Sequence, residues 1–124
     1  MNTLIKLFSI AILMILTSCA TTKTHSEANT TQKVKFSANS QKVYQIALRT
    51  ALQQKWEIKM KDSENYMFQG ETPSSMNKWP DDVGVYIVKE NNKTIMTIKS
   101  TLGHEPNKKF IKEYISQIKE KIKQ

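Results

Sequence analysis

The sequence predicts an α+β fold, in which an antiparallel sheet of about five strands is covered on one face by two helices. Three observations support this prediction. Apolar and polar residues alternate in short runs between residues 33 and 101, as they do in half-buried strands. Two longer segments, 43–54 and 106–122, repeat apolar residues every three to four positions, as amphipathic helices do. Short turn-forming segments join the alternating runs, so consecutive strands are expected to pair as hairpins.

The expected elements follow in the order strand, helix, four strands, helix. Their ranges are 33–36, 43–54, 56–61, 66–72, 82–89, 94–101 and 106–122. Residues 37–40, with the sequence SANS, offer several N-caps for the first helix. In the strand 56–61, alternation places Trp56, Ile58 and Met60 on one face.

The second hairpin and the last helix have clear local signals. Asn91 and Asn92 occupy the turn of the second hairpin and tolerate the positive φ that tight turns require. The longest irregular segment, 72–80, is expected to be a loop. Pro106 opens the last helix at its first turn, where a missing N–H is harmless.

The amino end is typical of an export signal. Lys6 precedes an apolar run, 7–16, which is about half the ~20 residues of a membrane-spanning helix, and small residues follow it. Leu16-Thr17-Ser18-Cys19 resembles the lipobox of bacterial lipoproteins. The resemblance implies cleavage between Ser18 and Cys19, a diacylglycerol on the thiol and an acyl chain on the new amine. An ordinary signal peptide with a chance cysteine is the alternative.

Three regions are therefore expected: a signal peptide, 1–18; a lipidated cysteine with a disordered tether, 19–31; and one small domain, 32–124. Residues 20–31 contain no large apolar side chain, so they cannot bury enough surface to offset the entropy of ordering. Ala20 follows the cysteine, where an Asp tends to retain lipoproteins at the inner membrane. By this resemblance the expected location is the outer membrane, facing the periplasm.

The residue types argue against an enzyme or a metal protein. His104 is the only histidine of the expected domain, and a structural zinc site needs about four Cys or His ligands. No Gly-rich phosphate loop is present among three glycines. We therefore expect no catalytic residue, metal or cofactor beyond the lipid on Cys19. A hydrolase using His104 with Asp81, Asp82 or Glu105 is the least favoured alternative.

The expected domain is similar to an uncharacterised bacterial family of unknown function. The resemblance rests on the segments FSANSQKVYQIALRTALQQKWEI, DDVGVYI, STLG and NKKFIKEYISQI. The matching positions are Trp56, Asp81, Asp82, Ser100, Gly103 and Asn107. Phe110 and Ile98 depart from it, because they stand where the family pattern has Arg and Ser. The resemblance implies an envelope-associated domain. From the residues alone, one aspartate of the pair is expected to cap the strand entry and the other to be solvated.

The basic composition, with formal net charge +8, favours a surface-binding role. We expect a non-enzymatic envelope binding or adaptor module that contacts another envelope protein or anionic lipid. Nucleic acid is set aside, because an exported protein would seldom meet it. The candidate interface residues are Met76, Trp79, Lys108, Lys109, Lys112 and Lys119. The alternative is a domain that binds lipid or a small apolar ligand in a cavity lined by Trp56, Phe68, Tyr86 and Ile111.

Overall fold

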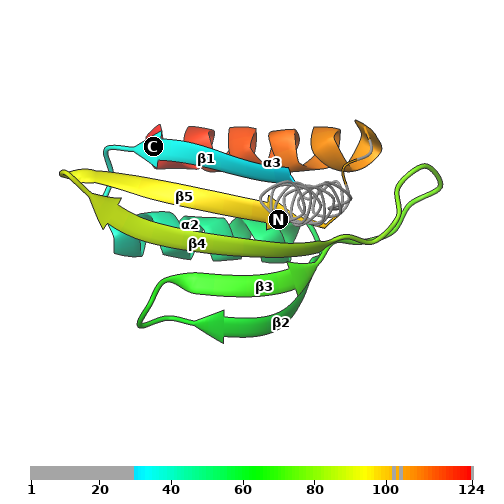
Figure 1. Ribbon diagram of the computed structural model, residues 1–124, viewed down its shortest axis with the longest axis horizontal. Helices are drawn as coiled ribbons and strands as arrows, with labels where there is room; N and C mark the ends of the chain where they lie inside the picture. The colour runs from blue at the N-terminus through cyan, green and yellow to red at the C-terminus, as the bar shows by residue number, and fades with distance from the viewer. Residues whose placement is uncertain (1–29, 102, 104, 124) are drawn as a thin grey trace, which may run out of the picture.

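The computed structural model describes residues 30–101, 103 and 105–123, so the predictions for the signal peptide, Cys19 and His104 lie outside the described residues. The elements follow one another in the predicted order (Figure 1). Their bounds are β1 Thr30–Phe36, α2 Ser40–Gln53, β2 Glu57–Asp62, β3 Met67–Glu71, β4 Asp82–Glu90, β5 Lys93–Ser100 and α3 Glu105–Lys123.

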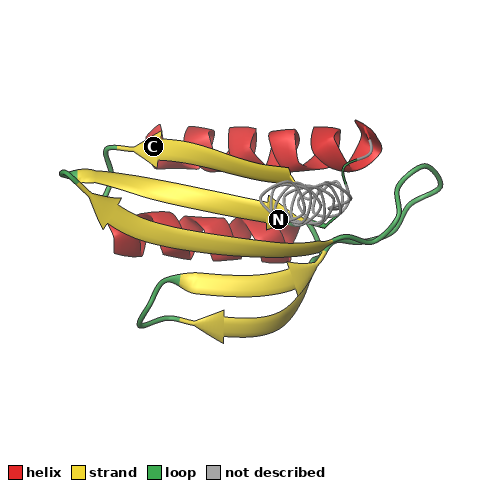
Figure 2. Ribbon diagram, viewed as in Figure 1, coloured by secondary structure: helices red, strands yellow, loops and turns green. Residues whose placement is uncertain are grey.

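The strands form one antiparallel sheet in the order β1-β5-β4-β3-β2. Both helices lie on the same face of this sheet, and among the described residues no helix covers the other face, which we call the uncovered face (Figure 2). The predicted α+β class is therefore confirmed. The two predicted hairpins, β2–β3 and β4–β5, are joined by the β3–β4 pairing, and β1 pairs with β5.

The core lies between the sheet and the helices. Alternate residues of β4 are buried toward the helices, whereas Tyr86 between them points to the uncovered face. The two helices are joined directly, because the buried Tyr114 hydroxyl of α3 donates to the Ala47 carbonyl of α2 at 2.7 Å. Trp56 completes the layer, with its ring centroid 4.6 Å from that of Tyr114.

Both ends of α2 are closed by local hydrogen bonds. The Asn39 side chain accepts from the Lys42 amide at 2.8 Å, as an N-cap does. At the other end Lys55 has φ 64°, and its N–H donates to the Leu52 carbonyl. The Trp56 N–H donates to the Ala51 carbonyl, which completes a Schellman motif with lysine in the place that glycine usually holds.

The structure corrects two sequence predictions. β1 begins at Thr30 and not at Lys33, so Thr30 and Thr31, assigned above to the tether, belong to the sheet. Main-chain pairing with β5 extends the strand there without any apolar side chain. The placement of Met60 beside Trp56 and Ile58 is also wrong. A bulge between Ile58 and Met60 shifts the register, and Met60 pairs with the outward-facing Gln69.

Candidate functional site

The loop 72–81 leads from β3 to β4 and extends beyond the end of the sheet (Figure 1). A bridge pairs Ser75 with Lys78: the Ser75 N–H donates to the Lys78 carbonyl at 2.8 Å, and the Lys78 N–H donates back at 3.3 Å. The bridge leaves Met76 at the tip, fully exposed. Trp79 follows it with 72% of its surface exposed. The loop therefore presents two large apolar side chains to solvent.

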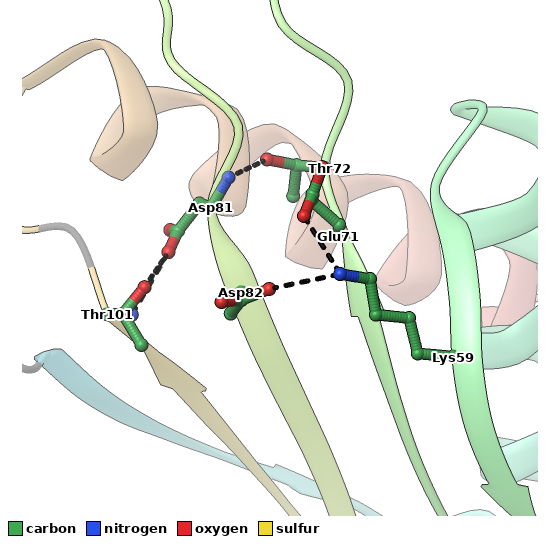
Figure 3. Close-up of polar contacts among 6 residues, drawn as sticks. All are labelled: Lys59, Glu71, Thr72, Asp81, Asp82 and Thr101. Carbon is green, nitrogen blue, oxygen red and sulfur yellow. Dashed lines mark hydrogen bonds and ion pairs between the residues drawn. The ribbon is translucent and has the colours of Figure 1, made fainter.

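Asp81 ties the base of the loop to β5. Its side chain is 1% exposed, and it accepts hydrogen bonds from the Thr101 N–H at 3.0 Å, the Thr101 hydroxyl at 2.8 Å and the Ser100 hydroxyl. Its own N–H donates to the Thr72 hydroxyl at 3.0 Å, which joins the two ends of the loop (Figure 3). The prediction that one aspartate caps the strand entry is confirmed for Asp81.

Lys78 and Asn107 extend this buried polar network toward α3. The Lys78 ammonium donates to the Thr72 hydroxyl at 3.2 Å and to the Pro73 carbonyl, and lies 4.5 Å from the Phe110 ring centroid. Burial lowers the pKa of Lys78, and the charge of nearby Asp81 partly opposes that shift. Asn107 donates to the Trp79 carbonyl at 3.3 Å. We call Thr72, Lys78, Asp81, Ser100, Thr101 and Asn107 the polar clamp.

Asp82, the second aspartate, faces solvent on the uncovered side of the sheet (Figure 3). Lys59 lies between two carboxylates there, 3.0 Å from Glu71 and 4.0 Å from Asp82. The hydrogen bond with Glu71 is the main cause that raises the pKa of Lys59. These pairs are exposed, so they contribute little to stability. The clamp, and not this ion pair, fixes the loop.

The first turns of α3 border an open groove of about 760 Å³. Its lining residues are Thr30, Thr31, Gln32, Asn77, Glu105, Pro106, Lys108, Lys109 and Lys112. The groove therefore joins the start of β1, the loop and three exposed lysines at one end of the sheet. We call Met76, Trp79, Lys108, Lys109 and Lys112, together with Thr30–Gln32, the loop end.

Most of the predicted interface residues meet at the loop end. Lys119 does not, because it lies seven residues beyond Lys112 on α3, about 10 Å farther along the axis. Lys119 is exposed near the other end of the helix. It is therefore not part of the candidate surface, although the same sequence pattern suggested it.

The predicted ligand cavity does not form as expected. Trp56, Phe68 and Ile111 are buried in the core, but Tyr86 lies on the opposite face of the sheet. The Gln69 side chain donates to its hydroxyl there at 3.2 Å. These four residues therefore cannot line one cavity. The hydrolase alternative depends on His104, which lies outside the described residues.

Sequence reasoning missed the burial of Lys78, which is only 6% exposed. A lysine in an irregular loop is ordinarily solvated, and the sequence does not show that Phe110 and the Pro73 carbonyl approach the Lys78 ammonium. Within the described part of the chain, no group of three or more His, Cys, Asp or Glu side chains is placed to hold a metal ion. No helix in that part has the length and apolar character needed to cross a membrane.

No protein-family model matches the chain, and no curated protein matches it. Among solved structures, it is similar to the crystal structure of TTHA0849 from Thermus thermophilus, with 11% identity and a TM-score of 0.47. The match covers 74% of this chain and 92% of that chain. At this level the likeness carries no argument about function.

Proposed function

We propose that the protein is an exported, lipid-anchored envelope lipoprotein that works without catalysis, as a binding or adaptor module. The loop end is its contact surface. The observation that carries this proposal is the exposure of Met76 and Trp79 on a loop whose base is fixed by the polar clamp. Exposed Trp is a frequent anchor of protein interfaces, and a pre-ordered loop loses less entropy on binding than a free one.

The proposed anchor is an acylated Cys19, which follows from the lipobox resemblance. The proposed location is the outer membrane, facing the periplasm. Residues 20–29 separate Cys19 from the first strand residue, and ten residues span at most about 35 Å. The domain would therefore work close to the bilayer, at high local concentration relative to any partner on that surface.

In-cell photo-cross-linking from position 79 tests the contact surface. The matched control is position 88, because Val88 is also exposed but lies on β4, outside the loop. We expect discrete adducts from position 79 and none from position 88. Equal labelling from both positions, or none from position 79, would contradict the assignment of the loop end.

Cys19→Ser tests the anchor in the same cells. We expect the native chain to fractionate with membranes and its mass to include the acyl chains on Cys19. The variant should lose that mass and the adduct from position 79. A native chain without acyl mass would refute lipid anchoring, whatever the cross-linking shows.

A further inference from the structure

We propose that the loop end docks on an anionic phospholipid surface, with Met76 and Trp79 in the interfacial layer and Lys108, Lys109 and Lys112 over the headgroups. This inference rests on the proposed function and adds to it the chemistry of the bound surface. It also sets the orientation of the domain, since the loop end would face the bilayer and the opposite end of the sheet would face away from it.

The first argument is the place where the chain enters the domain. Thr30, the first described residue, lines the same groove as the three lysines. The amino end of the described domain therefore lies at the loop end. Because only ten residues separate Thr30 from Cys19, an acylated Cys19 holds this end of the sheet nearest the bilayer.

The second argument is charge. Three lysines line the groove against one acidic residue, Glu105. Lys108 lies 3.8 Å from Glu105, whereas Lys109 and Lys112 are exposed and have no salt bridge within the described residues. Glu113, farther along the same helix, borders the adjoining hollow under the loop. The groove therefore carries net positive charge, which complements anionic headgroups.

The third argument is the apolar tip beside these lysines. Trp side chains favour the boundary between acyl chains and headgroups, and a flexible Met side chain adapts to an uneven surface. The Asn107 side chain donates to the Trp79 carbonyl, so the tryptophan is fixed directly to the helix that carries the lysines. An apolar tip flanked by basic residues is the arrangement that interfacial membrane binding uses.

The two tryptophans of the chain allow a direct test. Trp79 is exposed and Trp56 is buried, so quenching by bromine-labelled acyl chains reports Trp79 alone. The full chain, purified with its anchor, is reconstituted in vesicles of phosphatidylcholine with or without phosphatidylglycerol. We expect Trp79 to be quenched when phosphatidylglycerol is present, and quenching to weaken in neutral vesicles and at high salt. A Trp79→Phe chain provides the baseline.

A matched pair of variants on α3 tests the role of the lysines. Lys109→Gln/Lys112→Gln removes two exposed charges at the loop end, and Lys119→Gln/Lys123→Gln removes two exposed charges at the other end of the same helix. Removing one lysine near the anionic surface should lower the equilibrium constant for docking of the loop end about five-fold. We therefore expect about a twenty-five-fold loss for the first variant and less than a two-fold loss for the second.

Three results would overturn the docking proposal: no quenching in anionic vesicles, equal quenching in neutral ones, or equal losses in the two lysine variants. A protein adduct from position 79 without lipid quenching would also overturn it, in favour of a protein partner. The mass of the purified chain tests the anchor separately. If Cys19 carries no lipid, the proposed anchoring fails, and binding of the same chain from solution to both vesicle types still decides on docking.

Discussion

Replacing Asp81 with alanine should destabilise the domain strongly. Asp81 is buried, and its carboxylate accepts from Ser100 and from both the N–H and the hydroxyl of Thr101. A hydrogen bond to a charged group contributes about 1.5–3 kcal/mol, so three such bonds set an upper range of about 4.5–9 kcal/mol. The variant no longer buries a carboxylate, and water can reach Thr101, which is exposed, so we expect a net loss of about 3–4 kcal/mol.

Guanidinium unfolding of the purified chain measures this loss. With a slope of about 2 kcal/mol per molar for a domain of this size, the midpoint should fall by about 1.5–2 M. The matched control is Asp82→Ala, because Asp82 is exposed and lies 4.0 Å from Lys59. A surface pair contributes at most about 1 kcal/mol, so the control should shift the midpoint by less than about 0.5 M. Equal shifts in the two variants would refute the clamp.

The pH dependence of the Asp81→Ala variant gives a second check. Burial lowers the pKa of Lys78 and the charge of Asp81 raises it, so the variant should lower that pKa further. A lysine whose pKa is lower in the folded chain than in the unfolded chain disfavours folding at pH values below its folded pKa. This unfavourable effect is lost as the pH rises through the folded pKa and the lysine of the folded chain loses its proton. The loss in free energy of unfolding caused by Asp81→Ala should therefore become smaller as the pH rises from 7 through the folded pKa of Lys78. An unchanged penalty up to pH 10 would show that the two charges do not interact.

Three further variants test the fold. Lys55→Gly should raise the free energy of unfolding by about 0.5–1 kcal/mol, because Lys55 holds φ 64° at the end of α2; a lower midpoint would contradict the Schellman assignment. Gly70→Ala should lower the free energy of unfolding by about 1–3 kcal/mol in the same assay, because an added Cβ would lie 3.0 Å from the Glu57 carbonyl oxygen. Unchanged stability would show that the backbone of β2 shifts to make room for the methyl group. Tyr114→Phe removes the bond to Ala47 and should cost about 1 kcal/mol at pH 7. Burial raises the pKa of Tyr114 well above its usual value, so this difference should shrink above pH ~10, where the unfolded tyrosine ionises; a constant difference would refute that reasoning.

Local sequence signals predicted the elements well because each element carries its own periodicity. The turn of the β4–β5 hairpin is an example: Asn91 and Asn92 adopt φ 50° and 66°, as their residue type indicates. The bulge in β2 could not be predicted in this way. An alternating pattern assumes an unbroken ladder, and the extra residue between Ile58 and Met60 reverses the face of Met60 without changing the alternation.

The candidate surface was only partly predictable. Met76 and Trp79 are conspicuous in a polar loop, and the lysines of α3 follow from the helical pattern. What selects Lys112 and leaves out Lys119 is the position of the loop along the helix, which depends on tertiary contacts. Lys78 shows the same limit, since its ammonium lies over the ring of Phe110, which belongs to α3.

β1, the strand nearest the proposed anchor, pairs with β5, the last strand to be synthesised. Pairing two strands that lie so far apart in the sequence slows folding, because the chain between them loses conformational entropy before β1 and β5 come into contact. In the exported chain that we propose, the amino end would reach the bilayer while the partner of β1 was still to emerge. Acylation of Cys19 would then precede the pairing of Thr30 with Ser100. The domain would complete its sheet while already attached, and a partly folded chain would remain on the membrane and not diffuse away.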